Sequence, residues 1–427
     1  MIRKLACIGL LALAANASAA TTAIVGGKVV TVGPQGTIEN GTVLIVDGRI
    51  AAVGDDVRIP AGAETIDASG KIVTPGLFSP LSQLGLVEVS LSAGPIDGAQ
   101  RGERFTAGFD VADAYNPRST LIAINRIEGV TRTVSAPSPA YPDESGGGHI
   151  IAGLAAVVNL GEADALELRG AAVVVALGES GSQFAGGNRA AAWLTLRNAL
   201  DEALDYREHK GDFERGMRRP YAHSVADLEA LQGVINGNTP IIAGVNRASD
   251  IEVLIDFVND YSVKAIISGG AEAWMLANEI AAAGIPVIVD PTANLPGRFD
   301  SHNARGGSAT ILAEAGVKVA IGDNDTHNAR NLTQAAGNAV AHGLDWDAAL
   351  RAITLTPAEI YGVASTSGSL ETGKAADVVI WPGDPLELTN FPDQVFIKGE
   401  NIPMVSRQTL LRDRYLQSGK PPAYSQR

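Results

Sequence analysis

Residues 74–83, Thr-Pro-Gly-Leu-Phe-Ser-Pro-Leu-Ser-Gln, separate two parts of the chain that have different patterns. Before this stretch, short apolar runs are divided by turn residues, and Asp47-Gly48 joins residues 43–46 to residues 49–53. Asp-Gly favours a two-residue hairpin turn, because both central positions need a positive φ. After the stretch, apolar segments of helical and of strand length alternate. We therefore expect residues 74–83 to lead from a small β-sheet into a larger α/β domain.

The alternation of helices and strands is clearest between residues 249 and 322. Ser249 and Glu252 have the spacing of a capping box, and Gly284 suits the left-handed end of a helix. Strands that are apolar on both faces indicate a parallel sheet covered by helices on both sides. Eight such strands favour a closed (β/α)8, TIM-like barrel over an open sheet. They are expected over residues 72–78, 130–134, 150–158, 172–177, 240–245, 263–267, 286–290 and 317–321.

Strand-like segments return near the C-terminus, at residues 376–381 and 394–397. We expect these segments to pair with the N-terminal strands in one discontinuous β-sandwich domain. The predicted domains are therefore a β-sandwich from residues 20–74 plus 366–427, and a barrel from residues 75–365. Two long connections, residues 85–115 and 135–148, are predicted to cover one end of the barrel.

The N-terminus has the features of a secretory signal peptide over residues 1–19. Arg3 and Lys4 precede an apolar run, and Ala17-Ser18-Ala19 provides small residues for cleavage. The run is too short to span a bilayer, so we expect export to the periplasm or medium and no membrane span. Cys7 is the only cysteine and lies in this segment, so the mature chain is expected to lack disulfides and thiolate ligands.

Composition narrows the classes of partner. Of the 427 residues 46% are hydrophobic, and the formal net charge is −14, which becomes −16 once Arg3 and Lys4 are removed. An acidic chain with 5% aromatic residues has little to neutralise or stack on a nucleic acid, so nucleic-acid binding is not expected.

Several motifs carry a resemblance to a known family. Residues 350–358 read Leu-Arg-Ala-Ile-Thr-Leu-Thr-Pro-Ala, and residues 368–379 read Gly-Ser-Leu-Glu-Thr-Gly-Lys-Ala-Ala-Asp-Val-Val. With the Thr-Pro-Gly-Leu segment and the Asp47-Gly48 hairpin, they resemble the amidohydrolase superfamily, in its imidazolonepropionase-related exported branch. The resemblance implies a barrel with a flanking β-sandwich. In active members it also implies one or two divalent metals, which activate a water to attack a C–N bond other than a peptide bond.

The same resemblance implies a ligand set that this sequence largely replaces. After the first barrel strand, where an Asp and a His-x-His pair are implied, the sequence has Ser79, Leu81 and Gln83. A leucine cannot bind a metal, and a neutral amide is a poor ligand for a catalytic ion. After the fifth strand the implied histidine maps to Gly244 or Asn246.

The remaining positions of the implied set differ as well. Residues 268–270, after the sixth strand, are Ser-Gly-Gly, and Glu179 follows the fourth strand in place of a lysine. After the eighth strand Asp323 corresponds to the implied general base, although an Asp there would equally well cap the following loop.

The histidines supply few further candidates. His302, in the loop after the seventh strand, and His327 are candidate substrate-binding residues together with Gln83 and Asn246. For His327, beside Asp325, we favour a surface loop over a metal site. His149 is expected in a flexible turn, and His223 is expected to be exposed at a helix start.

We reach two hypotheses. In the first, the metal centre is degenerate, no cofactor is expected, and the chain is a weak or non-catalytic binding or partner subunit. In the second, the chain is an active amidohydrolase of small cyclic amides or peptides, with a divalent metal such as zinc and with Asp323 as base. A solute-binding scaffold is a third reading. The expected partners are a small amide or peptide ligand, and a second copy or an intact relative of this chain.

Overall fold

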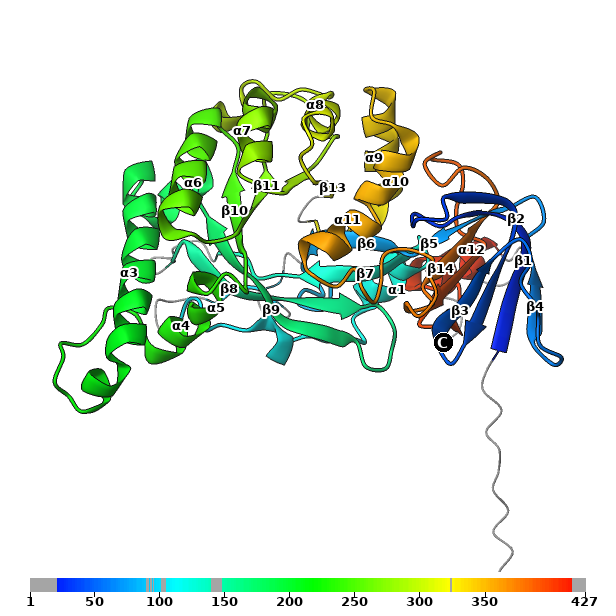
Figure 1. Cartoon of the computed structure of the whole chain (residues 1–427), viewed down its shortest axis with the longest axis horizontal. Helices are drawn as coiled ribbons and strands as arrows, with labels where there is room; N and C mark the ends of the chain where they lie inside the picture. The colour runs from blue at the N-terminus through cyan, green and yellow to red at the C-terminus, as the bar shows by residue number, and fades with distance from the viewer. Residues whose placement is uncertain are drawn as a thin grey trace, which may run out of the picture.

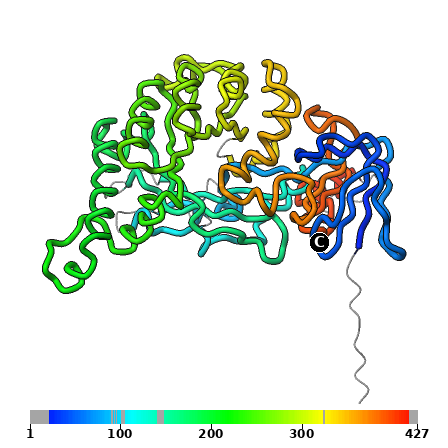
Figure 2. The backbone as a smooth tube through the Cα atoms, viewed as in Figure 1, coloured from blue at the N-terminus to red at the C-terminus, as the bar shows by residue number. Residues whose placement is uncertain are grey.

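The structure is a computed structural model that describes residues 21–89, 92, 94, 96–100, 105–139, 148–322 and 325–416. Two eight-stranded sheets form its framework. The smaller sheet lies at one end of the molecule, and the helices α3, α4 and α6 lie at the other end (Figure 1). The backbone trace shows the same elongated arrangement (Figure 2). Asp323 and the predicted signal peptide lie outside the described residues.

The smaller sheet is built from both ends of the chain. Its strands are β1 (Thr21–Val30), β2 (Thr37–Val46), β3 (Arg49–Gly54), β4 (Glu64–Asp67), β5 (Ile72–Pro75), β14 (Val378–Trp381), β15 (Gln394–Ile397) and β16 (Glu400–Asn401). β14 pairs antiparallel with β5. Strands from the two ends of the chain therefore lie side by side, while a two-layer sandwich stays a prediction. Asp47 and Gly48, with φ of 49° and 76°, make the predicted turn between β2 and β3.

The larger sheet has eight strands, and seven of them coincide with predicted strands, whereas only residues 77 and 78 of the first predicted strand, residues 72–78, belong to it. Its strands are β6 (Leu77–Ser82), β7 (Val130–Ser135), β8 (Ile151–Asn159), β9 (Leu166–Ala176), β10 (Ile241–Val245), β11 (Ala265–Gly269), β12 (Val287–Val289) and β13 (Val319–Ile321). Their spatial order follows the chain, and the edge strands β6 and β13 approach each other. The backbone of β6 is also bound from outside the sheet, because the Phe78 amide donates to the Ile353 carbonyl at 2.8 Å. The result is an α/β fold with a nearly closed barrel sheet.

One strand departs from the predicted parallel pattern. β8 runs antiparallel to both β7 and β9. The physical reason is the short connection between Asn159 and Leu166, because a parallel crossover needs a dozen or more residues. Ile151, at the start of β8, pairs with Val175 near the end of β9. Residues just before β8 therefore lie at the end of the sheet where the parallel strands finish.

Twelve α-helices are present in the described part of the chain. They are α1 (Thr120–Arg126), α2 (Gly178–Phe184), α3 (Arg189–Glu214), α4 (Val225–Ala230), α5 (Gln232–Ile235), α6 (Ala248–Tyr261), α7 (Ala277–Ala282), α8 (Ser308–Glu314), α9 (Leu332–Ala341), α10 (Trp346–Ala352), α11 (Leu355–Ile360) and α12 (Arg407–Leu416). None of the described helices is long and apolar enough to cross a membrane.

The start of α6 corrects the predicted capping box. The helix begins at Ala248, before Ser249, so Ser249 is inside the first turn. Glu272, a buried residue from the next connection, accepts a hydrogen bond of 2.9 Å from the Ala248 amide. A tertiary contact therefore replaces the local cap. Gly284 has the predicted left-handed conformation, with φ of 65°.

Candidate functional site

At the end of β6, the positions of the implied histidine pair have structural roles. Leu81 is 4% exposed and packs in the apolar cluster that contains Phe78 and Val134. The Gln83 amide donates to the Ser138 hydroxyl at 3.1 Å and more weakly to the Gly98 carbonyl at 3.4 Å. One side chain therefore fills the barrel interior, and the other fixes the two loops beside it.

At the end of β10, Asn246 joins a buried polar group. Its amide nitrogen donates to Asp300 at 3.3 Å, and its oxygen accepts from the Ala271 amide at 3.4 Å. Asp300 is 3% exposed. A cavity of about 290 Å³ lies over the ends of β10, β11 and β12, with Asn246, Asp290 and Arg298 among its lining residues. Asn246 is thus the predicted site residue that reaches a cavity at the barrel mouth.

The two predicted histidines of the rim are both exposed. His302 follows the short helix η3 (Phe299–Ser301). The backbone amide of His327 donates to Asp325 at 2.8 Å, so this Asp shapes its own loop as the surface-loop reading predicts. Within the described ranges, no hydrogen bond joins Gln83, Asn246, His302 and His327 to one another. Asp323, the predicted base, lies outside those ranges.

The donor atoms needed for a metal centre do not come together among the described residues. No group of three or more His, Cys, Asp or Glu side chains in those ranges is placed to hold an ion. Glu179, after β9, instead lies 3.8 Å from the guanidinium of Arg189. The residues present at the ends of β6, β10 and β11 therefore do not fit the metal centre that the family resemblance implies.

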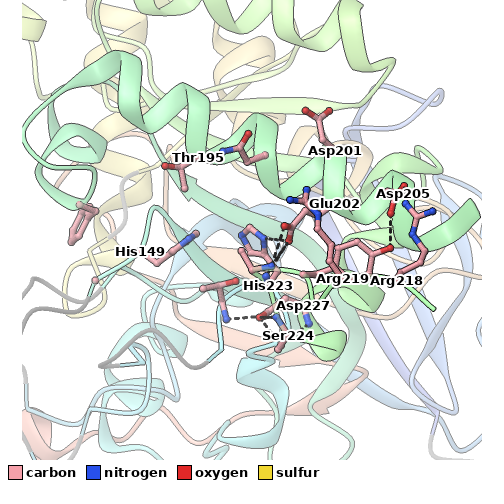
Figure 3. Close-up of a pocket in the computed structure, with 16 residues that line it drawn as sticks. His149, Thr195, Asp201, Glu202, Asp205, Arg218, Arg219, His223, Ser224 and Asp227 are labelled. Atoms are coloured by element: carbon pink, nitrogen blue, oxygen red, sulfur yellow. Dashed lines mark hydrogen bonds and ion pairs between the residues drawn. The ribbon is translucent and has the colours of Figure 1, made fainter. Parts of the chain in front are cut away.

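A larger cavity, of about 830 Å³, lies beside the rim between α3, α4 and the residues that precede β8. Figure 3 shows its polar side chains. We call it the lateral cavity, and its lining includes Thr195, Asp201, Glu202, Asp205, Arg218, Arg219, His149, His223 and Asp227. Its size is typical of cavities that bind small molecules.

His223 is held by a carboxylate at one side of this cavity. Its Nδ1 lies 3.0 Å from Glu202 Oε2, and Glu202 also accepts hydrogen bonds of 3.0 Å from the backbone amides of Ala222 and His223. The His223 side chain is 11% exposed, so it is not the exposed residue that the sequence predicts. Burial alone would raise the pKa of Glu202, but these hydrogen bonds outweigh it and lower the pKa.

His149 faces the same cavity, and its ring centroid lies 5.9 Å from that of His223. Its Nδ1 accepts a hydrogen bond of 3.1 Å from the Ile151 amide, which orders the start of β8. Burial, followed by the nearby His223, lowers the pKa of His149 to about 4. His149 is therefore a neutral side chain near pH 7, and residues 146 and 147 of its predicted glycine-rich turn lie outside the described residues.

Sequence reasoning missed this cavity because its two imidazoles are distant along the chain and belong to no short motif. The reversal of β8 carries His149 to the rim, and a kinked α3, non-helical at His209, leads the chain back toward His223. The predicted strands, residues 150–158 and 172–177, leave a gap long enough for a parallel crossover, so the short connection that reverses β8 was visible only once β9 was found to begin at Leu166.

Comparisons with known proteins agree with the fold. Residues 292–402 match the model of the Amidohydrolase family. The chain is 23% identical over 394 residues to "Amidohydrolase tasK" of Hapsidospora irregularis, covering 85% of this chain and 39% of that protein's length. It is 26% identical over 403 residues to "5-methylthioadenosine/S-adenosylhomocysteine deaminase" of Halobacterium salinarum, covering 88% and 87%.

The solved structure of an amidohydrolase from Thermotoga maritima superimposes with a TM-score of 0.79 at 23% identity, covering 89% of this chain and 99% of the other. This likeness concerns the fold. Together with the family match over residues 292–402 and the two long alignments, it shows that the chain is similar to members of the amidohydrolase superfamily over most of its length.

Proposed function

We propose that this chain is an exported amidohydrolase-superfamily protein that binds a small amide or peptide ligand and does not hydrolyse it through a metal-activated water. The observation that carries the proposal is the chemistry at the end of β6. There a buried leucine, Leu81, and a hydrogen-bonded amide, Gln83, occupy the positions of the implied imidazole pair. Without imidazole donors, an ion at the rim would be held too weakly to lower the pKa of its water toward neutrality.

Metal analysis of the purified full-length protein tests this proposal directly. The protein is incubated with zinc, manganese and iron salts, dialysed, and examined by mass spectrometry of the bound elements. We expect well below one ion per chain, whereas a superfamily member with an intact ligand set, treated in parallel, should retain its metal. Retention of about one ion per chain after dialysis would overturn the proposal. Export is tested by measuring the intact mass of the protein recovered from the periplasm. This mass should correspond to a chain cleaved after Ala19.

A second candidate function is hydrolysis of small cyclic amides or peptides, with Asp323 as base and a divalent metal such as zinc. One observation favours it, a cavity of about 190 Å³ whose lining includes Gly322, directly before Asp323, and Asp290. If this reading is right, Asp323→Asn should abolish turnover of an amide panel, while Asp325→Asn in the same loop should retain it. Equal turnover by Asp323→Asn and the unaltered protein would exclude Asp323 as the base.

A non-catalytic member would act through a partner, either a second copy of this chain or an intact superfamily relative. Light scattering of the purified protein alone measures its self-association, and light scattering of the mixture measures its association with the relative. A monomer that does not associate with the relative would leave ligand binding as the whole of the proposed function.

A further inference from the structure

One wall of the lateral cavity is a row of polar side chains on α3 (Figure 3). Four polar residues of this helix, spaced three or four positions apart, line the cavity: Thr195, Asn198, Glu202 and Asp205. Residues at this spacing share one face of a helix. Buried residues of the same helix, among them Trp193 and Leu200, pack in the apolar core instead. The sequence of α3 therefore gives the cavity hydroxyl, amide and carboxylate groups.

The carboxylates around the cavity already have donors from the protein. Asp205 accepts hydrogen bonds from Arg218 at 2.5 Å and from the Tyr221 hydroxyl at 2.6 Å. Asp227 accepts from the Ser224 hydroxyl at 2.6 Å and from two backbone amides at 2.7 and 2.9 Å. Carboxylates that are satisfied in this way do not require a cationic ligand.

The balance of charge also disfavours an anion. Four acidic side chains line the cavity, namely those of Asp201, Glu202, Asp205 and Asp227, against the two arginines Arg218 and Arg219. A ligand with a negative charge would meet this excess of carboxylates in a partly desolvated space. A neutral ligand with many hydrogen-bonding groups therefore suits the cavity better than an ion of either sign.

Two side chains of the lining have hydrogen-bonding groups to spare. Within the described part of the chain, neither the Asn198 amide nor the Arg219 guanidinium has a hydrogen-bond partner. An amide both donates and accepts, and a guanidinium has five N–H donors. His223 also faces this space. A ligand hydroxyl donates to an unprotonated ring nitrogen and accepts from a protonated one, so hydroxyl groups fit His223 in either protonation state.

Two aromatic rings, those of Phe184 and Tyr221, complete the lining. The Tyr221 ring is held in place by its hydrogen bond to Asp205 and by the ring of Phe213, whose centroid is 5.0 Å away. A sugar has hydroxyl groups around the edge of its ring and apolar C–H groups on its faces. Aromatic rings beside polar side chains therefore match both parts of a sugar.

We propose that the lateral cavity binds a neutral oligosaccharide of at least two sugar rings. Asn198 and Arg219 bind ligand hydroxyls, and Tyr221 contacts the face of a sugar ring. The volume of about 830 Å³ is sufficient for a disaccharide. The inference goes beyond the proposed function, because it concerns a different cavity and a different class of ligand. Retention of a metal at the barrel mouth would overturn the proposed function and leave this inference unaffected.

Calorimetric titration of the full-length protein with maltose and with cellobiose tests the proposal. The permethylated form of each disaccharide is the matched control ligand, because it keeps the sugar rings and lacks every hydroxyl donor. We expect at least one of the two disaccharides to bind, and its permethylated form to bind at least about tenfold more weakly, since it cannot donate hydrogen bonds. Absence of binding by both disaccharides, or equal binding of a disaccharide and its permethylated form, would overturn the proposal.

Variants locate the binding within the cavity. Arg219→Ala should weaken disaccharide binding by at least about tenfold, because hydrogen bonds from a charged group are lost, and Asn198→Ala should weaken it by about fivefold. Both side chains are exposed, so the fold should tolerate their removal. Arg215→Ala is the matched control, because Arg215 is also exposed and precedes Arg219 in the same loop but does not line the cavity; its affinity should be unchanged.

Circular dichroism confirms that each variant is folded, and Thr195→Phe provides a second test, because it narrows the cavity and removes no charged group. We expect Thr195→Phe to weaken disaccharide binding. Unchanged affinity in all of the cavity variants would show that the disaccharide binds elsewhere and would refute the assignment.

Discussion

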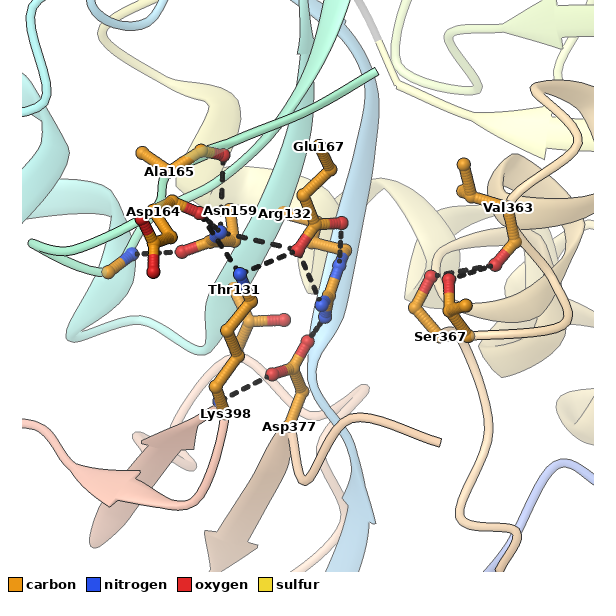
Figure 4. Close-up of polar contacts among 12 residues, drawn as sticks. Thr131, Arg132, Asn159, Asp164, Ala165, Glu167, Val363, Ser367, Asp377 and Lys398 are labelled. Carbon is orange, nitrogen blue, oxygen red and sulfur yellow. Dashed lines mark hydrogen bonds and ion pairs between the residues drawn. The ribbon is translucent and has the colours of Figure 1, made fainter. Parts of the chain in front are cut away.

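Replacing Arg132 by methionine tests what joins the two sheets. Arg132, on β7, is 2% exposed, and its guanidinium donates two hydrogen bonds of 2.9 Å to Glu167 on β9. It also forms an ion pair with Asp377, the residue directly before β14 in the smaller sheet (Figure 4). Lys398 contributes its charge to the same cluster, 3.4 Å from Glu167. Asp377 belongs to the motif at residues 368–379. One residue of that motif therefore forms an ion pair that joins the two sheets.

The expected cost follows from what Arg132→Met leaves behind. Both carboxylates, Glu167 and Asp377, would remain largely buried, and Lys398 would be the cation that remains beside Glu167. Removing one partner of a buried ion pair costs about 3–5 kcal/mol, because the charge that remains is uncompensated. We expect a loss of unfolding free energy in this range. Arg169→Met is the matched control, since Arg169 also pairs with two carboxylates but is half-exposed, and its loss should cost less than about 1 kcal/mol.

The effect should also depend on pH. Burial raises the pKa of Glu167, but Arg132, and next Lys398, outweigh burial and lower the pKa below its ordinary value of 4.5. A carboxyl whose folded pKa is lowered stabilises the fold above its unfolded pKa, and this stabilisation is lost as pH falls through the folded pKa. The difference between Arg132→Met and the unaltered protein should therefore be full at neutral pH and should shrink below pH 4.5.

Urea unfolding measures these differences, with tryptophan fluorescence and circular dichroism as two probes. Of the four tryptophans, Trp381 on β14 is 1% exposed and donates to the Thr74 hydroxyl at 2.9 Å, and Trp193 on α3 is 5% exposed, so the fluorescence reports on both parts of the fold. A cost below about 1 kcal/mol for Arg132→Met, equal to that of Arg169→Met, would refute the reasoning. So would a cost that stays the same at acid pH.

Three further predictions concern single side chains. Leu81→His should lower the unfolding free energy by about 1–3 kcal/mol, because it buries an imidazole in an apolar cluster; urea unfolding measures this, and unchanged stability would contradict it. Tyr361→Phe removes a buried hydrogen bond of 2.8 Å to the Pro80 carbonyl, and thermal unfolding should reveal a loss of about 1 kcal/mol, whereas an unshifted midpoint would exclude a net contribution. His149 should titrate with a midpoint of about 4 by NMR, and stability should rise with pH between 4 and 6.5 because the unfolded chain binds that proton first; His149→Asn should flatten this rise.

The sequence predicts the strands well because burial on both faces leaves a direct mark in composition. Seven of the eight predicted barrel strands are present in the larger sheet, and the turn at Asp47-Gly48 has the backbone that the dipeptide favours. The first predicted strand, residues 72–78, is instead divided at Gly76 between two sheets. At Gly76 the backbone passes so close to β7 that a Cβ there would collide with the Thr131 side chain. A local apolar pattern does not reveal which sheet a strand joins.

The candidate sites were harder to predict, because they depend on contacts between distant segments. Gln83 and Asn246 were selected by their positions after strands, yet their partners, Ser138 and Asp300, lie on other loops. The lateral cavity depends on the direction of β8 and on the kink in α3, and no periodicity encodes either feature. Position along a strand therefore locates the rim of the sheet but not the groups that meet there.

Two of the motifs that carry the family resemblance, the Thr-Pro-Gly-Leu segment and residues 368–379, have contacts that explain the fold without any chemistry. The Gly76 amide donates to the Asp377 carbonyl at 3.0 Å, which ties the segment between β5 and β6 to the return segment before β14. The Asp377 side chain reaches Arg132 on β7, so the same residue links the smaller sheet to the barrel. These motifs report how the two sheets are joined, whereas hydrolysis depends on donors at the far ends of the barrel strands. A chain can therefore keep the first set of interactions while Leu81 and Gln83 occupy the positions of the second, and resemblance in the motifs is evidence for the fold rather than for the reaction.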